Sequence, residues 1–181
     1  MATATIRVLT YLVTLQPTDS GDVTSVWNAE KIAKAFIEAN RIWKPADIVF
    51  AAEAPIAKTV VITAKDGGDT WPDFVNSLSP QNRKCVGVGF LYDLPGPEGG
   101  DGGGRIALIS GRKAGMGDAG FAGNLLAHEL GHVLIDDPEH KLAGKDPANL
   151  MYYKRGATDR PEKLTAEQIA KAQETAGRFA P

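Results

Sequence analysis

The chain opens with the alternation of a β-strand and continues with the spacing of a helix. Residues 5–15 alternate threonine with isoleucine, valine, leucine and tyrosine, which predicts a first strand. The next stretch, SVWNAEKIAKAFIEANRIWKP, predicts an amphipathic helix whose apolar face holds Ala29, Ile32, Ala33, Phe36 and Ile37. Because a proline disfavours helical geometry in the residue before it, this helix is expected to end just before Pro45.

Further strands and helices follow in a simple order. Strands are predicted for four short segments rich in apolar and β-branched residues: DIVFAA, KTVVITA, CVGVGFLYDL and GRIALIS. One or two helical turns are predicted for WPDFVNSL, and a mobile loop for the glycine- and proline-rich joint PGPEGGDGGG. The order of strand, helix, several strands and two more helices predicts an α+β (mixed α/β) fold with a twisted mixed sheet.

The last helix has a well-marked start. Thr165 and Gln168 have the spacing of a capping box, and Leu164 and Ile169 fit the hydrophobic staple around it. Gly177 is the expected stop of this helix, because glycine favours the conformation that ends helices.

Composition and charge narrow the class of protein. At 181 residues the chain is expected to form one domain with a buried core. The formal net charge is −2, and no cluster of lysine and arginine stands out, which argues against a nucleic-acid partner. The single cysteine, Cys85, excludes an internal disulfide framework and any multi-cysteine metal site.

Targeting signals are also missing from the pattern. No stretch reaches the roughly 20 apolar residues that span a bilayer, and the start MATATIRVLTYLVTLQ lacks the basic region and cleavage site of a signal peptide. We therefore expect a soluble protein without a membrane partner. Its compartment stays open, because a leader can be removed before the chain matures.

All three histidines of the chain lie within one stretch of thirteen residues, HELGHVLIDDPEH, at 128–140. On a helix with about 100° per residue, His132 lies about 40° and Glu129 about 100° round from His128. The opposite side of this helix is apolar and suits the core; it holds Leu126, Leu130, Val133 and Leu134. Gly131 costs about 1 kcal/mol against alanine in such a helix, so we expect another segment to approach it closely.

Two imidazoles four residues apart on a helix can share one zinc ion. Catalytic zinc takes three protein ligands and keeps a position open for water. The metal lowers the pKa of that water and polarises a scissile carbonyl. Glu129 lies beside the pair, where its carboxylate can take a proton from the water and pass it to the leaving amine. Helical context and motif together therefore predict a zinc centre with His128 and His132 as ligands.

HELGHVLIDDPEH followed by NLMYY resembles the metzincin clan of zinc endopeptidases, whose motif is H-E-x-x-H-x-x-G-x-x-H plus a later methionine turn. The resemblance implies one zincin-like catalytic domain. Residues 1–135 would form a lobe with the sheet and the active-site helix, and residues 136–181 a smaller lobe with the methionine turn and the last helix. It also implies that GRIALIS is an edge strand bordering the cleft, with which an extended peptide substrate can pair.

The resemblance assigns roles residue by residue. Glu129 is the general base, and Met151 is the turn methionine beneath the metal. Tyr153, two residues later, is a candidate to bind zinc or to stabilise the oxyanion, and the alternative is an aromatic residue packed in the turn.

The chain departs from the family pattern at the third ligand. Ile135 stands where the pattern has its glycine, and His140 comes two residues late. Pro138 disfavours helix at Asp137, and aspartate tolerates turn conformations, so a wider loop can bring the chain back. Because no other histidine exists, His140 is the expected third ligand.

Several acids compete for that place. Asp136 or Asp137 can supply an oxygen ligand, unless one of them caps local backbone groups. Glu162 and Glu174 are weaker candidates, and Glu167 suits the helix dipole in the first turn of the last helix.

The sequence thus predicts a soluble zinc-dependent endopeptidase that acts on a peptide or protein substrate. Because the spacing of the third histidine differs from the family pattern, a second possibility is a zinc-stabilised binding domain that cleaves nothing. A hydrolase of a non-protein amide is a third possibility, since the same metal chemistry permits it. Cys85 lies in a predicted strand without the surrounding pattern of a cysteine that holds such enzymes latent, so we expect a buried structural residue.

Overall fold

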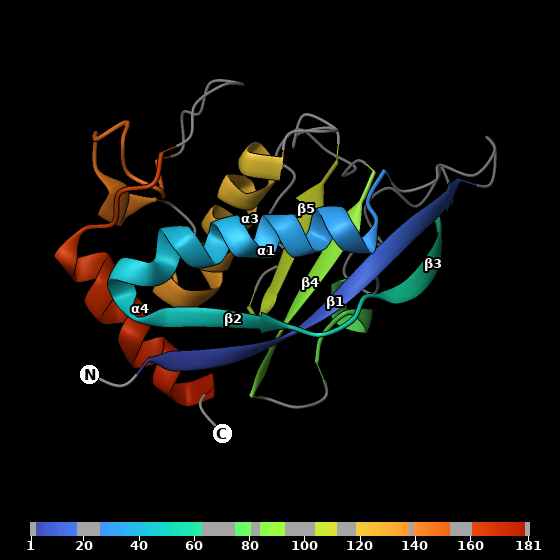
Figure 1. The fold of residues 1–181 in the computed structure, drawn as a ribbon, viewed down its shortest axis with the longest axis horizontal. Helices are drawn as coiled ribbons and strands as arrows, with labels where there is room; N and C mark the ends of the chain where they lie inside the picture. The colour runs from blue at the N-terminus through green and yellow to red at the C-terminus, as the bar shows by residue number, and fades with distance from the viewer. Residues whose placement is uncertain are drawn as a thin grey trace.

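The structure, a computed structural model, describes residues 3–17, 26–62, 75–80, 84–92, 104–111, 119–137, 140–152 and 161–179. Its elements follow the predicted order of strand, helix, several strands and two further helices, which confirms a mixed α/β architecture (Figure 1). Their bounds, with η for a short 3-10 helix, are β1 Ala4–Pro17, α1 Ala29–Trp43, η1 Lys44–Ala46, β2 Ile48–Ala52, β3 Ile56–Ile62, β4 Cys85–Leu91, β5 Ile106–Ser110, α3 Ala119–Ile135, η2 Lys141–Ala143 and α4 Ala166–Phe179. The predicted loop PGPEGGDGGG lies, up to residue 103, outside the described residues.

Strand β1 forms the centre of the sheet. It pairs with β2 near its start and with β3 near its end, while β4 pairs with its middle. Arg7 pairs with residues of both β2 and β4, and Tyr11 with residues of both β3 and β4. Therefore β2 and β3 follow one another along one edge of β1, and β4 occupies the other edge. Strand β5 extends the sheet beyond β4, which gives the order β2-β1-β4-β5.

All strand pairs that the structure describes are parallel, which differs from the predicted mixed sheet. Short apolar strands carry no signal of direction, because direction depends on the connections between them. Parallel sheets are covered on both faces, and β4 and β5 are buried along their whole length. Strand β5 ends the described order, in agreement with the edge position predicted for GRIALIS, and its residues are buried. The pairing of a substrate with this strand stays a prediction.

Residues on the two faces of the sheet belong to two separate apolar clusters. Val88 and Phe90 of β4 belong to the large cluster that also contains residues of α1 and α3. On the other face, a Cβ at Gly87 would lie 2.6 Å from the carbonyl oxygen of Leu78. The short segment 75–80 thus covers that face at a distance that only glycine allows.

Helix α1 lies across the sheet with α3 packed beside it, and α4 contacts α3 and η1, the short helix that follows α1 (Figure 1). It begins after Asn28, whose Oδ1 accepts the backbone N–H of Lys31 at 2.9 Å. As predicted, it ends at Trp43, before Pro45.

The buried face of α1 differs in part from the predicted one. It consists of Ile32, Ala35, Phe36, Ala39, Ile42 and Trp43. Ile37 is 70% exposed, because it lies about 100° round the helix from Phe36, and Ala29 and Ala33 are exposed as well.

Helix α4 contacts α3 and the central strand β1. Its predicted capping box is confirmed: Gln168 donates its backbone N–H to Thr165 Oγ1 at 3.1 Å, and Thr165 donates its own to Gln168 Oε1 at 2.9 Å. The predicted stop at Gly177 is wrong, since the helix continues to Phe179. Burial of the Phe179 ring contributes about 2 kcal/mol, which offsets the cost of about 1 kcal/mol for a glycine inside a helix. No described helix is both long and apolar enough to cross a bilayer.

Candidate metal centre

Helix α3 carries the histidine motif and is fixed in the core on its apolar side. Leu126, Leu130 and Leu134 are completely buried, as predicted. Trp43 of α1 donates its indole N–H to the carbonyl oxygen of Ala127 at 3.0 Å. Because this side of α3 is held by packing and by a buried hydrogen bond, the other side presents its polar residues in a fixed orientation.

Gly131 marks the place where another segment touches α3. A Cβ there would overlap Met151 Sδ and lie 3.2 Å from Met151 Cε. Met151 is completely buried and lies in a turn closed by the hydrogen bond from the Tyr152 N–H to the Asn149 carbonyl at 3.0 Å. The close approach predicted from the glycine is therefore confirmed.

The helix ends one residue later than the family pattern implies. Ile135, at the place of the family glycine, stays helical and is 1% exposed. Asp136 takes the left-handed conformation instead, with φ of 52°, and donates its N–H to the His132 carbonyl at 3.1 Å. An aspartate thus makes the turn that glycine usually makes at a helix end.

Asp137 brings His140 back toward α3. Its carboxylate accepts the backbone N–H groups of Lys141 at 2.9 Å and Leu142 at 2.6 Å, and its carbonyl accepts that of His140 at 3.2 Å. His140 has φ of 57°, a left-handed conformation that costs a non-glycine residue about 1 kcal/mol or more. The segment therefore holds His140 in a conformation that the free chain would avoid, as is common at functional sites.

The three imidazoles meet at one place. His128 Nε2 lies 3.2 Å from His132 Nε2 and 3.3 Å from His140 Nε2. The ring centroids are 4.6 to 5.2 Å apart, and the three ligand atoms all lie within 4.8 Å of one another. His128 is 6% exposed, whereas the other two are half-buried, so the group opens to solvent on one side. This group of three histidines can hold a metal ion.

The proton on His128 is fixed by its backbone partner. His128 Nδ1 lies 2.7 Å from the carbonyl oxygen of Leu150, which only accepts, so Nδ1 carries the proton and donates. In the neutral ring, Nε2 then holds a single lone pair. One lone pair makes one linear hydrogen bond, and two imidazole nitrogens approach it, so the three nitrogens are placed where they could share a bound cation.

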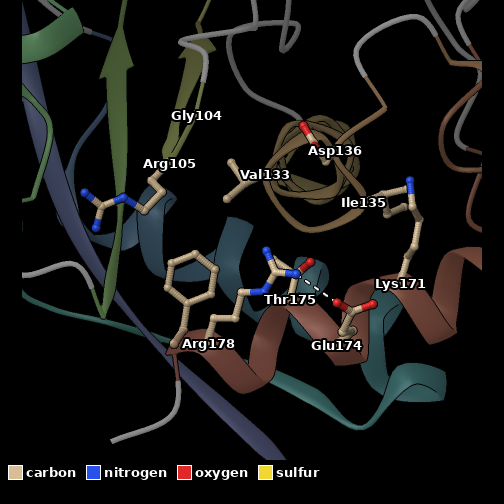
Figure 2. A pocket seen from close by; sticks show the side chains of 10 residues that line it. Gly104, Arg105, Val133, Ile135, Asp136, Lys171, Glu174, Thr175 and Arg178 are labelled. Carbon is tan, nitrogen blue, oxygen red and sulfur yellow. Dashed lines mark hydrogen bonds and ion pairs between the residues drawn. The ribbon is translucent and has the colours of Figure 1, made fainter.

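The competing acids are not part of the group among the described residues. Asp137 uses both carboxylate oxygens on backbone N–H groups, which is the capping alternative predicted for it. Asp136 is exposed and lines a separate pocket of about 740 Å³ between the end of α3, the start of β5 and α4 (Figure 2). Glu162 pairs with Arg41 at 2.5 Å. Glu174 pairs with Arg178 on the exposed side of α4, as the dashed line in Figure 2 marks.

Two further predicted residues have different outcomes. Glu129 follows His128 on α3 and is 5% exposed, so the predicted base is a buried residue next in sequence to a predicted ligand. Tyr153 lies outside the described residues, and its role stays a prediction.

The sequence did not indicate the partner of His128. Leu150 contributes its backbone carbonyl, and no pattern of side chains marks which backbone group will face a ring nitrogen. Cys85, in contrast, is 2% exposed, as expected of a structural residue.

Comparisons of the chain with protein-family models, with curated proteins and with solved structures give no match. The likeness to metzincins therefore rests on the motif residues themselves.

Proposed function

We propose that this protein is a zinc-dependent endopeptidase, with His128, His132 and His140 as the metal ligands and Glu129 as the general base. The observation that carries the proposal is the convergence of the three histidine Nε2 atoms, together with the burial of Glu129 next to His128 in the sequence.

The spacing of the nitrogens suits zinc. A zinc ion that binds imidazole nitrogens at 2.0–2.1 Å in tetrahedral array holds them about 3.3–3.4 Å apart. The two short Nε2 separations, 3.2 and 3.3 Å, are close to this value. Three protein ligands are also the number that leaves one position for water or substrate, and the half-buried side of the group gives access to it.

Glu129 supplies the proton transfers of hydrolysis. Zinc, when bound, contributes Lewis-acid chemistry: it makes water more acidic and polarises the substrate carbonyl. Glu129 takes a proton from the water whose oxygen attacks the carbonyl carbon. When the carbon–nitrogen bond breaks, the same carboxylate gives that proton to the leaving amine. In this proposal the buried Glu129 has the proton-transfer role, which a purely structural zinc site would not need.

Metal content is the first test. Mass spectrometry of the native wild-type protein is expected to find about one equivalent of zinc, which a folded His140→Ala variant largely loses. Zinc retained by that variant would move the third ligand to an acid. A wild type that takes up no zinc when zinc is offered would overturn the proposal.

Peptide cleavage is the second test. Zinc-loaded Glu129→Gln keeps the size of the side chain and the ligands, so it is expected to retain zinc while cleavage of casein or a peptide library falls at least a hundredfold. Glu174→Gln, which changes an exposed glutamate away from the site, is the matched control and should cleave like wild type. Zinc binding without cleavage by the wild type would instead support a binding domain or a hydrolase of another amide.

A further inference from the structure

Two buried amide side chains lie behind the histidine group. Asn149 and Gln168 are completely buried. Asn149 Nδ2 donates to Gln168 Oε1 at 2.9 Å, and Gln168 Nε2 donates to Asn149 Oδ1 at 3.1 Å. Each amide gives one donor and one acceptor to the other, a pattern that would also hold if both were flipped together, so partners outside the pair must fix its orientation.

Each of the two amides also accepts a backbone N–H, one from the turn and one from the start of α4. Asn149 Oδ1 accepts the N–H of Met151 at 2.9 Å, and Gln168 Oε1 accepts the N–H of Thr165 at 2.9 Å. The pair thus ties the turn 149–152 to the first turn of α4. A parallel bridge between Asn149 and Lys163 holds the turn from another side, with Leu150 donating its N–H to the Lys163 carbonyl at 2.8 Å.

Leu150 lies between Asn149, whose side chain is held by Gln168, and Met151, whose backbone N–H is held by Asn149 Oδ1. Its carbonyl oxygen is the group that accepts from His128 Nδ1 at 2.7 Å. Any rotation of the turn would move this oxygen, and with it the ring of His128 and the direction of Nε2. Partners that orient a histidine ligand in this manner change metal affinity by about 10- to 100-fold when they are removed.

We infer that Asn149 and Gln168 are positioning residues for the metal centre. They hold the Leu150 carbonyl so that His128 keeps its proton on Nδ1 and its Nε2 lone pair toward the other two histidines. The inference rests on the proposed metal site and extends it to α4, since Gln168 belongs both to the capping box and to the amide pair. A capping box alone needs the bonds between Thr165 and Gln168, and it has no need of Asn149.

Asn149→Ala tests this role against a structural one. It removes the partner of Gln168 and the acceptor of the Met151 N–H, and leaves all three histidines unchanged. Thr165→Ala is the matched control, because it weakens the start of α4 and leaves the amide pair and Leu150 intact. Zinc Kd is measured by competition with a chelator at fixed pH, next to the melting temperature of each metal-free protein.

Asn149→Ala is expected to raise the zinc Kd about 10- to 100-fold, and Thr165→Ala to leave it as in wild type even though its melting temperature falls. A second readout is nitrogen-15 NMR of the metal-free protein, in which His128 should carry its proton on Nδ1 in wild type and in Thr165→Ala, and on both nitrogens in exchange in Asn149→Ala. If Asn149→Ala does not fold, Asn149→Asp serves instead, since it keeps the size and the acceptor for Met151.

Equal zinc Kd values for wild type and the Asn149 variant would overturn the inference, as would an equal loss of affinity in Thr165→Ala. The peptidase proposal fails separately, by zinc binding without cleavage in the wild type, and the Kd comparison then still decides the positioning role. A wild type without any zinc affinity overturns the metal site and this inference with it.

Discussion

The contact between Gly131 and Met151 predicts that Gly131→Ala destabilises the wild-type protein but stabilises a protein that already carries Met151→Ala. Gly131→Ala adds a Cβ that would overlap Met151 Sδ and lie 3.2 Å from Met151 Cε, while Trp43 Cζ2 stays at an ordinary 3.5 Å. Met151 alone is therefore the obstacle to a side chain at position 131. When Met151→Ala removes the methionine side chain, the same Cβ should fit without overlap.

Two opposing terms set the magnitude in the wild-type background. Alanine in place of glycine stabilises a helix interior by about 1 kcal/mol. Overpacking of a tight core costs about 1–3 kcal/mol, and Met151 has little freedom to move because it is completely buried. The net effect of Gly131→Ala is thus expected to be a loss of up to about 2 kcal/mol. In the Met151→Ala background only the gain remains, so the substitution should stabilise by about 1 kcal/mol, and the coupling energy should be about 1–3 kcal/mol.

Urea unfolding of the four metal-free proteins, followed by circular dichroism, gives this coupling energy. Met151→Ala alone should cost about 2–5 kcal/mol, which a domain of ordinary stability survives. If Gly131→Ala changes stability equally in both backgrounds, the glycine does not serve the approach of Met151, and the reasoning is refuted.

Three further substitutions test the loop that carries His140 and, separately, the ion pair between Asp146 and Lys163. Asp137→Ala leaves two backbone N–H groups without their carboxylate, so unfolding free energy should fall by about 1–3 kcal/mol in urea titrations and zinc should bind more weakly. Asp136→Gly places glycine at a φ of 52° and should stabilise by about 1 kcal/mol with zinc content unchanged, whereas loss of zinc would make Asp136 a ligand. The hydrogen bond from Lys163 lowers the pKa of Asp146, so Asp146 stabilises the fold above its unfolded pKa of about 3.9 and this contribution is lost as pH falls through the lower folded pKa. The melting temperature of Asp146→Asn should therefore lie below that of wild type at pH 7 and approach it below pH 4, and a gap that stays constant down to pH 3 would contradict this sign.

Short-range sequence patterns correctly predicted features that depend on residues close together in the sequence. The end of α1 before Pro45 and the capping box of α4 each depend on residues within four positions of one another, and both are as predicted. The histidine group also followed from a local pattern, because two of its members share one face of a helix. Gly131 is the instructive case, since a locally unfavourable residue correctly predicted a contact with a distant segment.

Several other features that depend on distant partners were not predicted. The parallel direction of the described strands follows from how the elements are connected. The continuation of α4 beyond Gly177 likewise depends on the core that receives Phe179. The support of His128 by Leu150 involves a backbone carbonyl, and its identity emerges only when the turn and α3 come together.

In the proposed metal centre, the third histidine comes two residues later than in the metzincin motif. What a metal ion requires is the position of three nitrogen atoms, and the number of residues between them matters only through the path of the chain. Here Ile135 extends the helix and stays buried, and the reversal moves to Asp136. Asp137 then binds the backbone that follows, and His140 adopts a second left-handed conformation that turns its ring toward α3. Asp136 and Asp137 thus form the reversal of the chain that precedes His140. The site should therefore be more sensitive to the loss of Asp137, whose carboxylate holds the loop, than to the loss of Asp136, whose contribution is a backbone conformation that glycine can supply.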